Sequence, residues 1–586
     1  MSTHSATDTL DPGPSPRQVG TLGSTVSLRD WWKSGAPWIW LNASAVSVTL
    51  IFVVCLLGMI GWQGLSFFWP SRVVQAVYEQ PGTEPIPIVG EIVSSEEVAT
   101  ARLIAAGFEL DLKNEFYTRH LIKLGNRDVT GADFRYAIDD WLQAEQYPAP
   151  LAVIERREWG NLYGMVRAVK ENAQVVAEGE AAWPAFQERA GRADDLFDQI
   201  RVIEKRDLGA INYEINELRL EERRLELQYK KDGKDPKSVR QSERYGKIEA
   251  RRKELDIEYA GHQQKLVKLY ADLGRDSYVF EIADGSSSEF PMAKVVHGHQ
   301  PNTMSFFQRL WFFLGKLWEF VSDEPREANT EGGIFPAIFG TVMMVLLMTV
   351  FVTPFGVVAA VYLREYARQG WLTRTIRIAV NNLAGVPSIV FGLFGLGFFV
   401  YFLGASIDQA FYQEALPSPT FGTPGILWAS LTMALLTLPV VIVATEEGLT
   451  RIPRATREAS LALGATKAET LWRIVLPMAS PAIMTGLILA IARAAGEVAP
   501  LMLVGVVKLA PSLPLDLNAP FLHLDRKFMH LGFHIYDVGF QSPNVEAARP
   551  LVYATSFLLV IVIVVLNLTA VHIRNRLRER YKALDN

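Results

Sequence analysis

The sequence predicts an α-helical polytopic membrane protein with six transmembrane helices and an inserted α+β domain that carries a long antiparallel helical hairpin. Two observations predict this class. Hydrophobic residues make up 49% of the 586 positions, but charged residues still make up 21%. Apolar spans and a sizeable water-exposed part must therefore share the chain. Long apolar runs occur once near the N-terminus and five times after residue 330, with a polar stretch between them.

Composition also excludes several classes of function. The formal net charge of -5 gives no support to nucleic-acid binding. The single cysteine, Cys55, lies inside an apolar run, so no disulfide can form within the chain. Residues 1–37 are rich in Ser, Thr, Pro and Gly and are expected to form a flexible tail. They do not resemble a cleavable signal peptide, because the apolar run that follows starts late and is long.

Six segments have the ~20 apolar residues that a helix needs to cross a bilayer. The first belongs to a membrane region expected over residues 38–66, and the other five fall within residues 332–573. The predicted spans are Ala43–Trp62, Phe335–Leu363, Ile378–Leu403, Ile426–Ala444, Ala482–Val507 and Leu551–His572.

Basic residues set the expected orientation, because cytoplasmic loops carry an excess of Lys and Arg. Arginines cluster after the second, fourth and sixth predicted spans, whereas the loop after the third holds Asp408 and Glu414 and no Lys or Arg. Both termini, including the tail 574–586, are therefore predicted to be cytoplasmic. Residues 67–304 would then lie outside, which is the periplasm of a bacterium, and the protein would reside in the inner membrane.

The domain predicted over residues 67–304 combines short strands with a helical hairpin. Alternating apolar residues predict strands at Pro85–Val93, Arg119–Leu124, Leu151–Glu155 and Tyr278–Ile282. Two segments with heptad-like apolar spacing flank Gly233 and Pro236, which is typical of an antiparallel coiled coil over about 194–273. The hairpin could be a solvated strut, a docking arm for a periplasmic partner, or a sensor.

Residues 305–331 are expected to form an interfacial helix and a linker. The segment SFFQRLWFFLGKLWEFV is too short and too charged to cross a membrane. Its aromatic residues, among them Trp311 and Trp318, favour a helix that rests on the outer leaflet. A core helix of the outer domain explains the same pattern equally well.

The most informative motif is EASLALGATKAETLWRIVLP, at Glu458–Pro477, inside a loop predicted over 446–477. It follows the pattern E-A-A-x3-G-x9-I-x-L-P, with Ser460 in place of the third small residue. Its apolar side needs a partner to cover it. Glycine permits a turn, and Pro477 is expected to end the second helical piece. The matching residues are Glu458, Ala459, Gly464, Ile474, Leu476 and Pro477. The alternative is a helix pair that lies on the membrane.

The motif resembles the EAA loop of ABC-importer permeases, which docks into the ATPase subunit. Further strings sharpen the resemblance: AGVPSIVFGLFG begins at Ala384, TLPVVIVATEEGL begins at Thr437, and ARAAGEVAPL begins at Ala492. Together, in this order, they resemble the PstA family of permease subunits of phosphate importers, over residues 332–586 and the first span. The resemblance implies the type I ABC importer permease fold. The shorter family members lack the large outer insertion.

The resemblance also implies the partners. A periplasmic phosphate-binding protein, PstS, would deliver phosphate to a heterodimer of this chain with the permease PstC. Two copies of the ATPase PstB would bind the cytoplasmic loops and carry the ATP and Mg²⁺. This chain shows no Walker A pattern, because Gly315-Lys316 is followed by Leu317 and lacks the phosphate-cradling loop. We therefore expect a non-catalytic subunit without a cofactor of its own.

The expected substrate path centres on Arg493, which lies near the middle of the predicted fifth span, and on Glu497 one turn later. A charge inside a membrane is costly and faces a partner or an aqueous path. Arginine suits phosphate because its planar fork donates two hydrogen bonds at once. Ser388, beside Pro387, and Thr437, before Pro439, are further candidates on the path. A purely structural Arg493–Glu497 pair is the alternative.

Other functions remain open at this level. The chain could be the permease of another oxyanion importer, its outer domain could report phosphate supply to a regulatory protein, or it could be a scaffold. No metal site is predicted. His523, His530 and His534 lie in the last outer loop, where a short re-entrant or amphipathic helix explains their spacing as well as a metal does.

Overall fold

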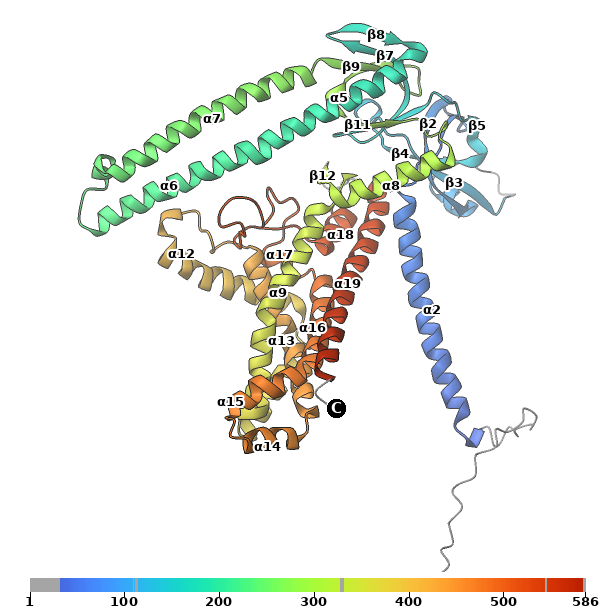
Figure 1. Ribbon diagram of the computed structural model, residues 1–586. Helices are drawn as coiled ribbons and strands as arrows, with labels where there is room; N and C mark the ends of the chain where they lie inside the picture. Colours follow the sequence, from blue (N-terminus) through green and yellow to red (C-terminus); the bar gives the residue numbers. More distant parts are fainter. Residues whose placement is uncertain (1–31, 109, 111–113, 327–330, 543–544, 583–586) are drawn as a thin grey trace, which may run out of the picture. The chain divides into compact units, whose positions relative to one another are not determined.

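The computed structural model describes residues 32–108, 110, 114–326, 331–542 and 545–582 (Figure 1). Most of the predicted tail, residues 1–37, therefore lies outside the described residues, as does 583–586. The chain forms two compact units, which meet in sequence between Ile60 and Gly61. The first unit contains most of α2 (Ala36–Ser66), whose described side chains are exposed nearly all round. A helix that is apolar on every side and exposed requires an apolar solvent.

Six helical segments among the described residues are long and apolar enough to cross a membrane, as predicted. They are Pro37–Ser66, Phe335–Tyr366, Ser388–Phe411, Ile426–Arg451, Lys467–Gly496 and Ala548–Glu579. Most are longer than the apolar runs that predict them, because helices continue past the apolar residues into polar ones. The tail predicted from residue 574 is thus helical as far as Lys582.

The predicted third span, Ile378–Leu403, is wrong in its bounds. Its first residues belong to a separate amphipathic helix, α10 (Trp371–Leu383), and the span begins only at α11 (Ser388–Phe394). Pro387 separates the two helices, because the residue before a proline avoids the helical conformation and proline has no N–H. A π-helical segment (Gly395–Gly404) and α12 (Ala405–Phe411) complete the span.

The predicted fifth span, Ala482–Val507, is also wrong. The helix α16 (Leu476–Gly496) ends eleven residues earlier than Val507, and the short helix α17 (Leu501–Val504) follows it. The apolar run continues through Val498 and Ala499, so hydropathy alone does not reveal the break. Pro500 and the change of Glu497 to an extended backbone interrupt the helix.

The core of the membrane part joins α9 (Phe335–Val361), α13 (Ile426–Arg451) and α16. Methionine and small side chains fill it, among them Met348, Met433 and Ala490. Buried threonine hydroxyls donate to carbonyl groups one turn earlier in their own helices, which satisfies them without water. Thr341, Thr432, Thr445 and Thr555 all make this hydrogen bond.

Two antiparallel sheets build the domain between the first two spans, which we call the two-sheet domain (Val73–His299). The first sheet has the order β4-β3-β2-β1-β5. Its strands are β1 (Val73–Tyr78), β2 (Ile86–Ala99), β3 (Phe116–Lys123), β4 (Phe134–Ile138) and β5 (Leu142–Gln146). The second sheet has the order β10-β9-β7-β6-β11, and β8 pairs with β7. Its strands are β6 (Ala152–Arg156), β7 (Leu162–Glu171), β8 (Gln174–Glu178), β9 (Asp276–Glu281), β10 (Ser287–Pro291) and β11 (Val295–His299).

The helical hairpin is inserted between β8 and β9 (Figure 1). Its first arm consists of α5 (Ala182–Val202), a π-helical turn (Ile203–Asp207) and α6 (Leu208–Lys231), and its second arm is α7 (Glu243–Leu273). The predicted start near residue 194 is wrong, because α5 begins at Ala182 and packs on the sheet instead of on α7 alone. The predicted apolar stripes do meet between the arms. Members of these clusters include Ile211, Leu225, Ile248, Leu255 and Leu266.

The helix α8 (Phe306–Ser322) is amphipathic, with one polar face and one apolar face. Lys316 and Glu319 form ion pairs with Glu155 and Arg326, which tie the polar face to the two-sheet domain. Burial alone would raise the pKa of Glu319, but bonds from His297 and Lys316 outweigh it and hold this pKa well below its usual range. The aromatic face is exposed, with Trp311 79% exposed, so it is not part of the domain's core.

Close contact between α13 and α16 predicts the effect of a substitution at Gly486. A Cβ placed there would lie 2.5 Å from the Cβ of Ala444. We expect Gly486→Leu to lower stability by about 1–3 kcal/mol, the usual cost of overpacking, measured as the thermal midpoint in detergent. The control Gly397→Leu places its side chain where nothing lies within 4 Å. Equal midpoints for the two variants would contradict this packing.

Candidate functional site

The motif at Glu458–Pro477 folds as a turn between two helices that leads directly into a membrane span. We call Arg454–Val475 the EAA segment; it consists of α14 (Arg454–Ala462), α15 (Lys467–Thr470) and a π-helical turn (Leu471–Val475). Gly464 has a φ of +88°, a conformation that costs a residue with a Cβ about 1–2 kcal/mol. Glycine is therefore required by the backbone, as predicted for this position.

Local hydrogen bonds fix the angle between α14 and α15. A capping box starts α15: the Glu469 N–H donates to the Thr466 hydroxyl, and the Thr466 N–H donates to the Glu469 carboxylate. The buried hydroxyls of Ser460 and Thr470 lie 2.9 Å apart and hydrogen-bond across the turn. Ser460, which departs from the pattern in sequence, therefore has a structural partner.

The EAA segment presents an exposed, partly apolar surface. Glu458 and Ala459 are exposed on α14, Leu463 is 89% exposed, and Trp472 is 71% exposed. Leu471, in contrast, is buried in a cluster with Leu449 and Ala479. Large apolar side chains in such positions mark surfaces that another molecule covers.

The prediction that Pro477 ends the second helical piece is wrong. The helix runs from Lys467 to Gly496 without interruption, and Pro477 lies in the first turn of α16. Proline has no N–H to donate to the carbonyl of the preceding turn, and the altered hydrogen bonding of the π-helical turn directly before Pro477 accommodates this missing donor. Ile474, Leu476 and Pro477 are half-buried where the EAA segment becomes the span.

Arg493 lies in the last turn of this span, so the prediction that it lies near the middle is wrong. Its Nε atom lies 3.8 Å from Oε1 of Glu497, and both side chains are only partly exposed. The break after Gly496 places Glu497 on extended backbone while keeping it beside Arg493. The two charges offset each other within this chain.

The two other predicted path residues occupy different environments. Ser388 is half-buried at the start of α11, whose Phe391 shares the buried core with Leu501 of α17. The structure therefore brings this helix start near the break that follows Arg493. Thr437 is fully buried, and its hydroxyl donates to the carbonyl of Met433 at 2.8 Å. Its hydroxyl also lies 3.5 Å from the sulfur of Met348 on α9, so it is occupied by protein contacts.

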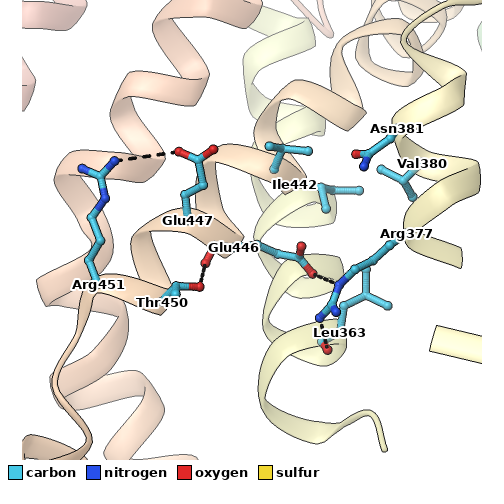
Figure 2. Close-up of a pocket in the computed structure, with 10 residues that line it drawn as sticks. Leu363, Arg377, Val380, Asn381, Ile442, Glu446, Glu447, Thr450 and Arg451 are labelled. Atoms are coloured by element: carbon cyan, nitrogen blue, oxygen red, sulfur yellow. Dashed lines mark hydrogen bonds and ion pairs between the residues drawn. The ribbon is translucent and has the colours of Figure 1, made fainter. Parts of the chain in front are cut away.

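A cavity of about 370 Å³ lies between the end of α9, α10 and α13 (Figure 2). A second cavity of about 540 Å³, bounded also by α16, shares Asn381, Val443, Glu447 and Arg451 with it. Arg377 points toward Glu446 and donates to it at 3.3 Å, while Arg451 lies 3.9 Å from Glu447. Two arginines thus face two glutamates, and this balance gives the cavity no net attraction for a multiply charged anion.

The sequence reasoning missed these cavity residues. Glu446 and Glu447 lie within a string that carries the family resemblance, but the ion pair of Glu446 joins it to Arg377, which is 69 positions away in the chain. The amphipathic pattern of α10, with Arg374 and Arg377 among apolar residues, was the available signal, because such a helix does not fit a membrane span.

The hairpin contacts two loops of the membrane part. Arg224 of α6 pairs with the largely buried Glu414 at 2.5 Å, and the Tyr213 hydroxyl donates to the carbonyl of Ala519 at 2.5 Å. Burial raises the pKa of Glu414, but the bond from Arg224 outweighs it and leaves the pKa lowered. These contacts lie three helical turns apart on α6, so they fix the arm at two points.

The three histidines of the last loop do not form a metal site in the described part of the chain, where no group of three or more metal-binding side chains occurs. A short helix, α18 (Leu531–Phe540), is present instead, and His530 accepts a hydrogen bond from the Gly532 N–H at its start. His534 is buried within that helix.

Comparisons with known proteins agree with the membrane architecture. The family described as "Binding-protein-dependent transport system inner membrane component" matches residues 352–581. The phosphate transport system permease protein PstA 1 of Mycobacterium tuberculosis is 36% identical over 244 residues, 42% of this chain and 71% of that protein. PstA of Mycobacterium leprae is 41% identical over 30% of this chain and 52% of that protein. PstA of Yersinia pestis is 37% identical over 31% of this chain and 56% of that protein.

Six apolar helices and this family match define a multi-pass membrane permease of the ABC transporter class. The chain belongs to the PstA family of phosphate transport system permease proteins. The two-sheet domain and its hairpin lie outside the matched residues 352–581.

Proposed function

We propose that the chain is the transmembrane permease subunit of an ATP-driven, high-affinity importer of inorganic phosphate. Membership of the PstA family is the observation that carries this proposal. The chain would form half of the translocation path with a PstC-type permease and receive phosphate from a PstS-type binding protein. It would reside in a bacterial inner membrane with both termini cytoplasmic and the two-sheet domain in the periplasm. The chain would be non-catalytic, and the partner ATPase would hold ATP and Mg²⁺.

The EAA segment is the proposed docking site for a PstB-type ATPase. Its exposed leucines and Trp472 would insert into a complementary groove, and Glu458 and Ala459 would lie at the contact. Because α16 continues from the segment without a break, a displacement at the docking site would reach Arg493 along one helix.

Reversing the charge of Glu458 tests the docking site. We expect Glu458→Lys to lower the yield of ATPase that co-purifies with the permease and to reduce phosphate transported per ATP, each by at least roughly tenfold, because reversing a charge that a partner surface complements costs more than about 1.4 kcal/mol. Glu579→Lys, at an exposed position on α19, is the control. Coupled transport at the wild-type level in Glu458→Lys would contradict the assignment.

Arg493 is the proposed phosphate contact, with Glu497 as its partner when the path is empty. Phosphate would displace the carboxylate and receive two hydrogen bonds from the guanidinium fork. Ser388, at the start of α11, would add a hydroxyl, and Thr437 would support the wall of the path through its helix.

Removing the guanidinium of Arg493 distinguishes a role in transport from a purely structural role. We expect Arg493→Ala to assemble and hydrolyse ATP but to lose phosphate uptake in proteoliposomes by roughly 10- to 100-fold, the effect of losing hydrogen bonds to a charged group. Arg549→Ala, at an exposed arginine on α19, should transport normally. Normal uptake by Arg493→Ala, or loss of assembly, would overturn the proposed contact.

The exposed face of α8 is proposed to lie in the outer leaflet. Phe307, Trp311, Leu314 and Trp318 follow a spacing of three or four residues and form one stripe. Trp69, three residues after α2, packs against Phe306 and Phe313, and the N–H of Ile334, just before α9, donates to Phe320. The helix is therefore fixed between the ends of two apolar spans, where tryptophan favours the bilayer interface.

Site-specific fluorescence tests this position. In a Cys55→Ser background, Trp311→Cys labelled with a polarity-sensitive dye should emit at shorter wavelength in phosphatidylcholine nanodiscs and be quenched by spin-labelled lipid. Ile257→Cys on α7, at a comparably exposed apolar residue (73%), should show neither effect. Equal behaviour of the two labels would place the α8 face in water or against protein.

A further inference from the structure

The end of α9 next to the EAA segment is a polar junction between four elements. Here the helix passes into a π-helical turn (Tyr362–Tyr366) and stops before Ala367. The last carbonyl groups of a helix have no partner within it and accept hydrogen bonds from other segments. Lys467 of α15 and Arg377 of α10 supply such bonds, and Arg457 of α14 pairs with a carboxylate of the same turn.

The first two contacts hold the EAA segment. The Arg457 guanidinium of α14 lies 3.1 Å from the Glu365 carboxylate and donates to the Leu449 carbonyl at 2.7 Å. The Lys467 ammonium, at the start of α15, donates to the backbone carbonyl of Glu365. It also lies 4.6 Å from the centre of the Tyr366 ring, a cation–π distance. Both helices of the segment are therefore attached to one turn of α9.

The third contact extends the junction to the helices around the cavity. Arg377 of α10 donates to the Leu363 carbonyl at 3.2 Å while it donates to Glu446 of α13 (Figure 2). The same turn of α9 is thus attached to the EAA segment on one side and to α10 and α13 on the other.

We propose that Glu365 is a positioning residue that makes the EAA segment and the second span move together. This inference rests on the proposed docking of an ATPase at the EAA segment. The Glu365–Arg457 pair is the ion pair that joins α14 to this turn, whereas Lys467 joins α15 to the same turn through the backbone carbonyl of Glu365. Without the pair, α14 would lose its side-chain attachment to the turn, and a displacement of α14 would be passed less directly to α9. With the pair, one displacement acts on α9 and α16, which both pack against α13.

The burial of the pair makes this attachment strong. The side chains of Arg457 and Glu365 are 19% and 13% exposed, so both are largely removed from water. Removing one partner of such a pair leaves the other charge without compensation, which costs far more than breaking an exposed ion pair. Arg451–Glu447, an exposed pair within α13, offers no comparable link between elements.

The test compares Glu365→Gln, Glu365→Arg, Arg457→Glu and the double variant Glu365→Arg/Arg457→Glu in the assembled complex. Arg368→Gln removes a charge at an exposed position three residues away and is the control. We expect the single variants to retain the ATPase but to transport roughly tenfold less phosphate per ATP hydrolysed. The double variant should regain most of the phosphate transported per ATP hydrolysed, because it restores an ion pair between the two positions. Wild-type coupling in all single variants, or loss of assembly that the double variant does not restore, would overturn the proposal.

A second measurement does not depend on the substrate. Spin labels at Tyr362→Cys on the turn and Ala455→Cys on α14, both exposed positions, report their separation in a Cys55→Ser background. The distance should stay the same with and without trapped ATP when Glu365 is present. It should broaden or shift on ATP trapping in Glu365→Gln. A distance that changes equally in both proteins would overturn the inference, whereas a wrong substrate would show only as absent phosphate transport by the unmodified complex.

Discussion

The uninterrupted helix from Lys467 to Gly496 is the constraint on which the functional interpretation depends. It contains 30 residues and therefore extends about 45 Å at 1.5 Å per residue. Two prolines, Pro477 and Pro481, lie within it and would ordinarily break it. The helix continues through the π-helical turn before Pro477, so α15 of the EAA segment and Arg493 belong to one helical element. A displacement of α15 is therefore connected to Arg493 along a single helix.

Helix packing limits how that element can move. Gly486 and Gly448 bring α16 into close contact with α13, and buried threonine hydroxyls of the core donate within their own helices. Other buried groups bond between elements: the Ser430 hydroxyl donates to the Met344 carbonyl, and the Leu531 N–H donates to the Thr341 hydroxyl. A group of charged contacts lies at the end of α9, where Glu365, Arg377 and Arg457 join four segments. Rigid helices connected by a few charged contacts can change their relative positions in discrete steps.

The sequence predicts the elements well but not their ends. Hydropathy identifies all six spans, and the positive φ of Gly464 agrees with the turn expected there. Hydropathy does not reveal where a helix ends inside an apolar run, as at Gly496. It also does not reveal that a helix continues through a proline, as at Pro477. Each depends on backbone hydrogen bonds that leave no trace in composition.

Charged contacts between residues that are far apart in the chain also cannot be predicted from the spacing of residues in the sequence. Arg493 and Glu497 are four positions apart, so their spacing suggests a pair, and they lie close together although the helix ends between them at Gly496. Lys467 and Glu365 are 102 positions apart, so only the folded chain brings them together. The apolar spacing of the hairpin also does not predict that α5 begins at Ala182. The buried face of α5 packs on a sheet and does not continue the row of apolar residues through which the two hairpin arms meet.

The most direct measurement is the ATPase activity of the complete complex in lipid, with its binding protein, as a function of phosphate. The interpretation predicts that phosphate-loaded binding protein raises the ATPase rate and that phosphate accumulates inside the vesicles in proportion to the ATP hydrolysed. Stimulation by sulfate or molybdate and not by phosphate, or hydrolysis that no oxyanion changes, would contradict the assignment of this permease to phosphate import.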